Sequence, residues 1–126
     1  MYVTTPSTEF PAPDAGSTAR VGAAAVLSTG PELPGWVGTF ELFSDPTRVK
    51  LLIAIHAAPD GSVSELSAAT GIAANTVSQS LLTLHEAGVL AVRRDGRYRR
   101  WRLTDHAAHQ VLHHMHAPHS PLHPEH

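Results

Sequence analysis

The chain has 126 residues, of which 42% are hydrophobic and 16% charged, a length that fits one folded domain with terminal extensions. It contains no cysteine, which excludes a disulfide scaffold, thiolate catalysis and any cysteine-ligated zinc or iron–sulfur site. The formal charge of -2 excludes a protein that is basic overall, but it is compatible with a locally basic surface. Histidine is unusually frequent, because its 10 copies outnumber the 9 lysines and arginines.

No targeting or membrane segment stands out. The first positive side chain is Arg20, so the sequence does not begin with the basic region of a signal peptide. No apolar run approaches the roughly 20 residues that a bilayer-spanning helix needs. We therefore expect a soluble cytoplasmic protein with no membrane partner.

The composition divides the chain into three parts. Residues 1–33 are rich in Pro, Thr, Ser, Ala and Gly, which predicts a disordered segment with at most a short helix near Ala19–Leu27. Residues 34–116 are dense in periodic apolar side chains and are expected to form the folded domain. Residues 117–126 mix proline with histidine, which indicates a flexible tail.

Helical periodicity opens the folded domain. Apolar side chains recur at helical spacing between residues 36 and 43 and predict a first helix. The pair Asp45-Pro46 predicts the start of a second helix, because it fits an N-cap followed by the first helical position. Asp60-Gly61 ends that helix.

A helix-turn-helix unit is predicted next. Residues 62–65 have the spacing of a capping box and open a short helix that a turn at residues 70–72 ends. A fourth helix follows, with an apolar stripe that begins at Val77, and Gly88 stops it.

The period then changes to two. Residues 89–93 and 98–103 flank Arg94-Asp95-Gly96-Arg97, which is typical of a β-hairpin turn. Four helices followed by a hairpin are the order of a winged helix-turn-helix, a mainly α fold with a β-hairpin wing.

The fourth helix and the hairpin supply a candidate DNA-reading surface. Amide side chains can read adenine edges and hydroxyls reach phosphates, so a polar helix face suits a recognition helix. The hairpin holds six of the nine basic residues within ten positions, a density that indicates phosphate contact. The predicted contacts are Asn75, Thr76, Ser78, Gln79, Ser80 and Thr83 on the helix and Arg93, Arg94, Arg97 and Arg99 on the hairpin.

Plainer interpretations stay open for both pieces. The polar helix face could be merely solvated. Some of the hairpin arginines, which also include Arg100 and Arg102, could cover the aromatic side chains or pair with Glu86 and Asp105.

A set of motifs runs in order through residues 36–116. It comprises Phe43-Ser44-Asp45-Pro46-Thr47-Arg48, Ser64-Glu65-Leu66, Thr76-Val77-Ser78-Gln79-Ser80-Leu81, Glu86-Ala87-Gly88-Val89-Leu90 and the arginine-rich hairpin. This set resembles the ArsR/SmtB family, small dimeric winged-helix repressors that commonly release operator DNA when a metal binds. The resemblance implies a homodimer of α-α-α-α-β-β-α subunits on double-stranded operator DNA. Two positions depart from the family pattern, Ala73 where a capping hydroxyl is usual and Ser80 where histidine is frequent.

The last predicted helix carries a stripe of histidines. Thr104 or Asp105 can cap this helix, and side chains three or four residues apart on one face can bind the same ion. Neutral imidazole is a good ligand for nickel, zinc and cobalt. The candidate metal ligands are Asp105, His106, His109, His113 and His116.

The ligand spacing differs from that of the family. The terminal-helix site of several members reads Asp-x-His, ten residues, then His-x-x-His or Glu, and here only Asp105 is in place, because Ala107 and Pro118 occupy the next positions. A metal site in this chain is therefore a variant one. Participation of the tail histidines stays open, namely His119, His123 and His126. His56 and His85 are expected to be ordinary packing or surface residues.

The sequence thus favours a transcriptional regulator, acting as a repressor, whose operator affinity is controlled by nickel, zinc or cobalt. Two alternatives remain, a winged-helix regulator controlled by a protein co-regulator and a histidine-rich metal store. An enzyme is not expected, because no glycine-flanked nucleophile or phosphate-binding loop stands in a suitable context.

Overall fold

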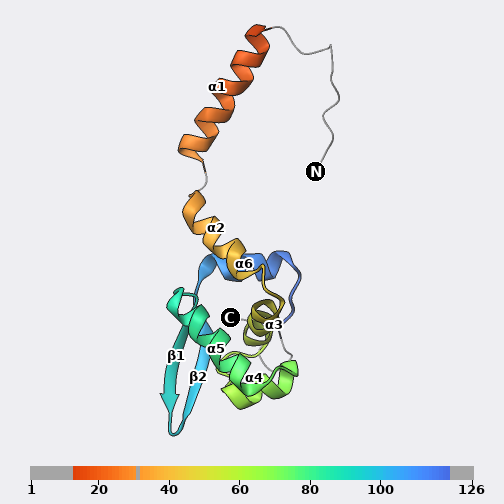
Figure 1. Ribbon diagram of the computed structural model, residues 1–126, viewed down its shortest axis with the longest axis vertical. Helices are drawn as coiled ribbons and strands as arrows, with labels where there is room; N and C mark the ends of the chain where they lie inside the picture. Colours follow the sequence, from red (N-terminus) through yellow and green to blue (C-terminus); the bar gives the residue numbers. More distant parts are fainter. Residues whose placement is uncertain (1–12, 31, 120–126) are drawn as a thin grey trace. The chain divides into compact units, whose positions relative to one another are not determined.

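The computed structural model describes residues 13–30 and 32–119 of the chain (Figure 1). The chain divides after Leu33 into two units. The predictions for residues 1–12 and 120–126, including those for His123 and His126, lie outside the described residues.

Helix α1, Pro13–Thr29, occupies the segment whose composition predicted disorder. It contains the stretch Ala19–Leu27, over which the sequence allowed a short helix, and extends beyond it at both ends. Five of its 17 residues are alanine, the residue with the highest intrinsic helix propensity. Its side chains are exposed from residue 17 onward, so local propensity rather than burial accounts for this helix.

The remaining elements follow the predicted order. They are α2 (Leu33–Leu42), α3 (Pro46–Ala57), α4 (Val63–Thr70), α5 (Ala74–Glu86), β1 (Leu90–Asp95), β2 (Tyr98–Leu103) and α6 (His106–His114). This order confirms the mainly α winged helix-turn-helix fold, in which β1 and β2 form the wing (residues 90–103). Within the described ranges, no helix is both long enough and apolar enough to cross a membrane.

Side-chain caps fix where two of the helices begin, as the sequence predicted. The Asp45 carboxylate accepts a hydrogen bond from the Arg48 backbone N–H at 2.9 Å and caps α3. Ser62 and Glu65 form a reciprocal capping box at the start of α4, in which the Ser62 N–H donates to Glu65 Oε1 at 2.9 Å. Ala73, by contrast, precedes α5 without any side-chain cap.

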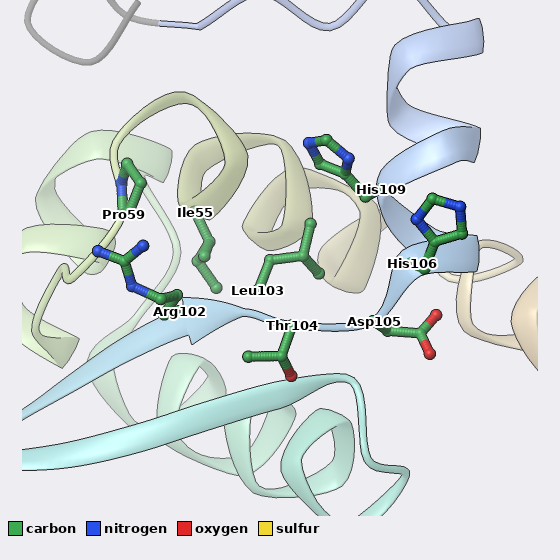
Figure 2. A pocket seen from close by; sticks show the side chains of 8 residues that line it. All are labelled: Ile55, Pro59, Arg102, Leu103, Thr104, Asp105, His106 and His109. Atoms are coloured by element: carbon green, nitrogen blue, oxygen red, sulfur yellow. The ribbon is translucent and has the colours of Figure 1, made fainter. Parts of the chain in front are cut away.

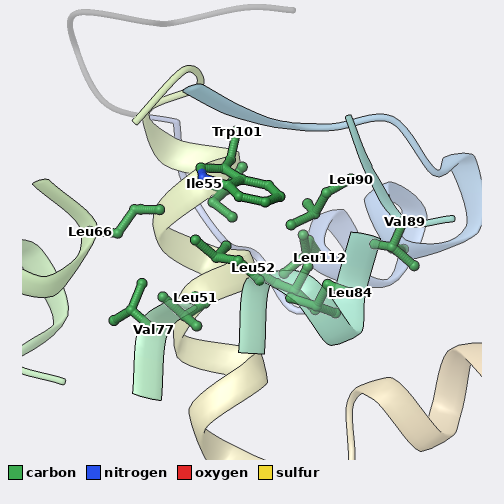
Figure 3. Packing of buried hydrophobic residues seen from close by; sticks show 12 residues of the cluster. Leu51, Leu52, Ile55, Leu66, Val77, Leu84, Val89, Leu90, Trp101 and Leu112 are labelled. Carbon is green, nitrogen blue, oxygen red and sulfur yellow. The ribbon is translucent and has the colours of Figure 1, made fainter. Parts of the chain in front are cut away.

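The core lies where α3, α5, the wing and α6 meet (Figure 3). Its fully or nearly buried apolar side chains are Leu51, Leu52, Ile55, Leu66, Val77, Leu81, Leu84, Val89, Leu90, Trp101, Ala108 and Leu112. Burial of one such leucine or valine contributes about 1.5–3 kcal/mol. Leu112 is 0% exposed, so α6 belongs to the folded domain and packs on α3.

The wing is an antiparallel hairpin joined to the loop after α3. Gly96 has a φ of 63° at the tip, which a residue without a Cβ adopts at no steric cost. At the base, the Asp60 N–H donates to the Trp101 carbonyl at 2.9 Å, and the Trp101 N–H donates to the Gly61 carbonyl at 3.1 Å. These two bonds attach β2 to the segment that connects α3 and α4.

Candidate DNA-binding surface and histidine cluster

Helix α5 buries one face and presents a polar face, as a recognition helix requires. The predicted contacts Asn75, Thr76, Gln79 and Thr83 are exposed, and Ser78 and Ser80 are half-buried. The buried face carries Val77, Leu81 and Leu84. The exposed face of α5 thus offers amide and hydroxyl groups, which suit base edges and phosphates, and also the half-exposed side chain of Leu82.

Four arginines of the wing are exposed, namely Arg93, Arg94, Arg97 and Arg99. Within the described part of the chain, none of the four lies within 4.0 Å of a carboxylate oxygen. The Arg97 guanidinium lies 5.3 Å from the centroid of the Tyr98 ring. The predicted arginines thus form a cationic surface on the wing that makes no direct ion pair with the carboxylates of the described residues.

The other two arginines of the wing form ion pairs within the domain. Arg100 contacts Glu65 at 2.9 Å and Asp95 at 3.1 Å. Arg102 contacts Asp60 at 2.7 Å. These contacts hold β2 against the start of α4 and the loop between α3 and α4, so Arg100 and Arg102 stabilise the position of the wing.

The carboxylates in these pairs differ from Glu86 and Asp105, the partners that the sequence suggested. The bridge between the α3–α4 loop and β2 brings Asp60 beside the wing, a contact that local spacing does not reveal. The hydrogen bond from Arg102 lowers the pKa of Asp60. The backbone N–H of Ser62 lowers the pKa of Glu65.

The structure gives Asp105 the role of a helix cap. Its carboxylate accepts a hydrogen bond from the Ala108 backbone N–H at 2.8 Å. Asp105, His106 and His109 line one pocket of about 300 Å³, together with Ile55, Pro59, Arg102, Leu103 and Thr104. Figure 2 shows the Asp105 carboxylate and the His109 ring pointing in different directions, so this pocket does not bring them together as ligands.

Four histidines converge between α3, α6 and the segment after α6, and we call His56, His109, His113 and His119 the histidine cluster. One ring nitrogen from each lies within 4.8 Å of the others. The Nε2 atoms of His109 and His113 are 3.2 Å apart. His56 is 0% exposed, His113 is exposed, and the other two are half-buried. This arrangement can hold a single metal ion through nitrogen atoms alone.

The cluster overlaps only partly with the predicted ligands. His109 and His113 belong to it, whereas Asp105, His106 and His116 do not. Helix α6 ends at His114, and His116 follows in the left-handed region with a φ of 62°, so it leaves the helical face on which the prediction placed it.

Sequence reasoning assigned no ligand role to His56 and left that of His119 open. His56 belongs to the buried face of α3 and lies among apolar side chains, which is a pattern typical of packing. The ring centroids of His56 and His119 are 4.2 Å apart. Only the packing of α3 against α6 brings these side chains to the same place, and no local signal in the sequence marks it.

Helices α2 and α6 share an exposed apolar surface. Phe40 is 59% and Met115 45% exposed, and Val37 is also exposed. Trp36, Phe40, Val111 and Met115 line a pocket of about 360 Å³ with Gln110 and His114. Apolar side chains gathered in this way are typical of a surface that another protein covers.

The domain matches a known family. Residues 45–92 match the family described as bacterial regulatory protein, arsR family. An arsenical resistance operon repressor, ArsR, from Halobacterium salinarum is 33% identical over 76 residues, which are 60% of this chain and 59% of the relative. The chain thus spans less than two thirds of that relative's length.

Solved structures share the fold over most of the chain. The transcriptional repressor BigR from Xylella fastidiosa has a TM-score of 0.58 and 25% identity, with 83% of this chain and 94% of that chain covered. The homodimeric winged helix-turn-helix domain Mb0332 from Mycobacterium bovis has a TM-score of 0.55 and 16% identity, with 87% of each covered. The family and the fold are those of DNA-binding transcriptional regulators, not of enzymes. Residues 45–92 of the chain thus match the arsR family of bacterial regulatory proteins, the family that its motifs resemble.

Proposed function

We propose that this chain is a DNA-binding transcriptional repressor whose operator affinity is controlled by a divalent transition metal. The observation that carries the DNA-binding part is the pairing of two exposed surfaces, the polar face of α5 and the cationic surface of the wing. In a protein with a formal charge of -2, this local basic surface attracts phosphate. Helix α5 then reads base edges while the wing contacts the backbone.

A homodimer on the operator follows from the apolar surface of α2 and α6. Mb0332 is homodimeric. In a homodimer of this chain, the second copy would cover the exposed apolar side chains of α2 and α6. A symmetric dimer would present two α5 helices to two half-sites, so the expected operator is an inverted repeat.

The metal control rests on the histidines of α6. The relative from Halobacterium salinarum is named for arsenical resistance, but this chain contains no cysteine. Arsenic prefers thiolate ligands, whereas imidazole suits nickel, zinc and cobalt. The Nε2 atoms of His109 and His113 are 3.2 Å apart, close enough for both to bind the same ion. This distance supports nickel, zinc or cobalt as the inducer.

The test is fluorescence anisotropy on DNA from upstream of the gene, at one salt concentration, with EDTA, Ni(II), Zn(II) or Co(II). We expect one metal to change operator affinity at least about tenfold, or about 1.4 kcal/mol. Equal affinity in every condition would overturn metal control and favour a protein co-regulator. Absence of specific DNA binding, with several weak metal equivalents, would instead indicate a metal store.

A further inference from the structure

We infer that the four residues of the histidine cluster form a complete metal site within one protomer, and that this site holds one zinc-class ion in four-coordinate, all-nitrogen geometry. The ligands are His56 of α3, His109 and His113 of α6, and His119 of the following segment. The inference deepens the metal control proposed above, on which its regulatory meaning rests. It differs from a site that two terminal helices share across a dimer.

The distances fit such an ion. Zinc binds imidazole nitrogen at about 2.0–2.1 Å, so two nitrogens of a tetrahedral site lie about 3.4 Å apart. The Nε2 atoms of His109 and His113 are already 3.2 Å apart. The four ring nitrogens lie within 4.8 Å of one another, so rotation about side-chain torsions closes the remaining gaps.

The position of His56 sets this cluster apart from a solvated histidine stripe. His56 is 0% exposed, and three other imidazoles surround its ring, with centroids 5.1, 5.2 and 4.2 Å away for His109, His113 and His119. A scavenging surface has no need of a fully buried imidazole. His56 is fixed in the core, and His119 lies on the segment after α6. An ion bound by both would therefore link that segment to α3.

The donor set favours zinc over nickel. The cluster offers four nitrogens and no carboxylate, and the nearby Asp105 is engaged as the cap of α6. Four-coordinate tetrahedral sites are typical of zinc, whereas a six-coordinate ion would need further oxygen or nitrogen ligands. Co(II) adopts the same geometry and serves as a spectroscopic substitute.

The test uses the full chain without DNA. Titration with Co(II) should saturate at one equivalent per protomer and produce the intense visible absorption of tetrahedral cobalt, which Zn(II) then displaces. His56→Gln and His119→Gln should each lower Zn(II) affinity at least about 100-fold, the upper end of what loss of an outer-shell partner costs. The matched controls are His106→Gln and His116→Gln, which remove exposed histidines outside the cluster and should leave affinity unchanged.

Each outcome decides a separate point. A weak cobalt spectrum would overturn four-coordination, and sensitivity to His106→Gln instead of His119→Gln would overturn the ligand set. A randomly exchanged mixture of His56→Gln and His119→Gln protomers should bind no better than either alone. Recovery of about a quarter of the sites, one of the two in each mixed dimer, would show that ligands come from both protomers. If His56→Gln fails to fold in a thermal melt, His109→Gln takes its place. Intact zinc binding without any effect on operator affinity would overturn the proposed function but leave this site standing.

Discussion

Asp60 and Arg102 form an ion pair of 2.7 Å that joins the loop after α3 to the second strand of the wing. Backbone bonds of Trp101 with Asp60 and Gly61 reinforce the same junction. His56 lies near the end of α3, four residues before Asp60 in the following loop, so a single stretch of chain carries a proposed ligand of the histidine cluster and the attachment of the wing. An ion bound at His56 would therefore act on the same stretch of chain that holds the wing, the element that we propose to contact the DNA backbone.

Asp60→Asn should lower the free energy of unfolding near neutral pH by at most about 1 kcal/mol, because the pair is partly exposed. The hydrogen bond from Arg102 holds the pKa of Asp60 below the ordinary value of an aspartate carboxyl. The ion pair therefore stabilises the fold fully at a pH above the ordinary pKa of an aspartate carboxyl. Its contribution to the free energy of unfolding is lost as the pH falls through the lowered pKa of Asp60. Urea unfolding across this range measures the effect, and a stability difference between wild type and variant that persists in acid would contradict it.

The same variant should weaken the communication between metal and DNA. We expect Asp60→Asn to reduce the metal-dependent change in operator affinity, normally about 1–3 kcal/mol for such coupling, while Zn(II) affinity of the free protein stays the same. Glu65→Gln is the matched control, because it removes the charge from another wing contact and keeps a capping-box side chain. An equal loss of coupling in both variants would mean that general loosening of the wing, rather than the α3 junction, is responsible.

The fold could be predicted from the sequence because its signals are local. The caps at Asp45 and Ser62 and the Asp-Gly hairpin each depend on a few neighbouring residues, and the structure has all three. Helix α1 differs from the prediction, because its alanine-rich composition supports a helix without a buried face.

The candidate sites could be predicted only in part. Helical and strand periodicity indicate which positions of α5 and the wing are exposed, so the polar and basic side chains at these surfaces could be predicted. The partners of Arg100 and Arg102 and the convergence of His56 with His109 depend on how α3 packs against α6 and the wing. Tertiary contacts of this kind join residues far apart in the chain, so no regular spacing of residues in the sequence reveals them.

Arg97 and Gln79 should make different contributions to DNA binding. Arg97→Ala removes an exposed cation of the wing, so it should weaken binding to all sequences alike and reduce the slope of log affinity against log salt by about 1. Gln79→Ala removes an exposed amide of α5, so it should relax base preference at one position and leave the salt slope unchanged. Anisotropy titrations at several salt concentrations on matched and mismatched operators separate the two effects. A sequence-specific loss from Arg97→Ala would contradict the assignment of the wing to phosphate.

Phe40→Glu should break the homodimer that the α2 and α6 surface supports. Phe40 is 59% exposed and lines the pocket beside Met115, so a charge there would be buried without a partner in a dimer. Sedimentation should show a folded monomer with weaker operator binding. Val21→Glu, at an exposed apolar position of α1, is the control and should stay dimeric. A dimeric Phe40→Glu protein would place the interface elsewhere.

Asp105 should prove to be a cap and not a ligand. Its carboxylate bonds the Ala108 N–H at 2.8 Å, and Asp105 lies outside the histidine cluster. Asp105→Ala should therefore cost about 1 kcal/mol of unfolding free energy, since loss of an N-cap typically has this effect, whereas Asp105→Ser should retain most of the stability because a hydroxyl also caps. Both variants should bind Zn(II) with wild-type stoichiometry. If Asp105→Ser keeps the stability but loses metal affinity, the carboxylate binds the ion, and the donor set of the site contains oxygen as well as nitrogen.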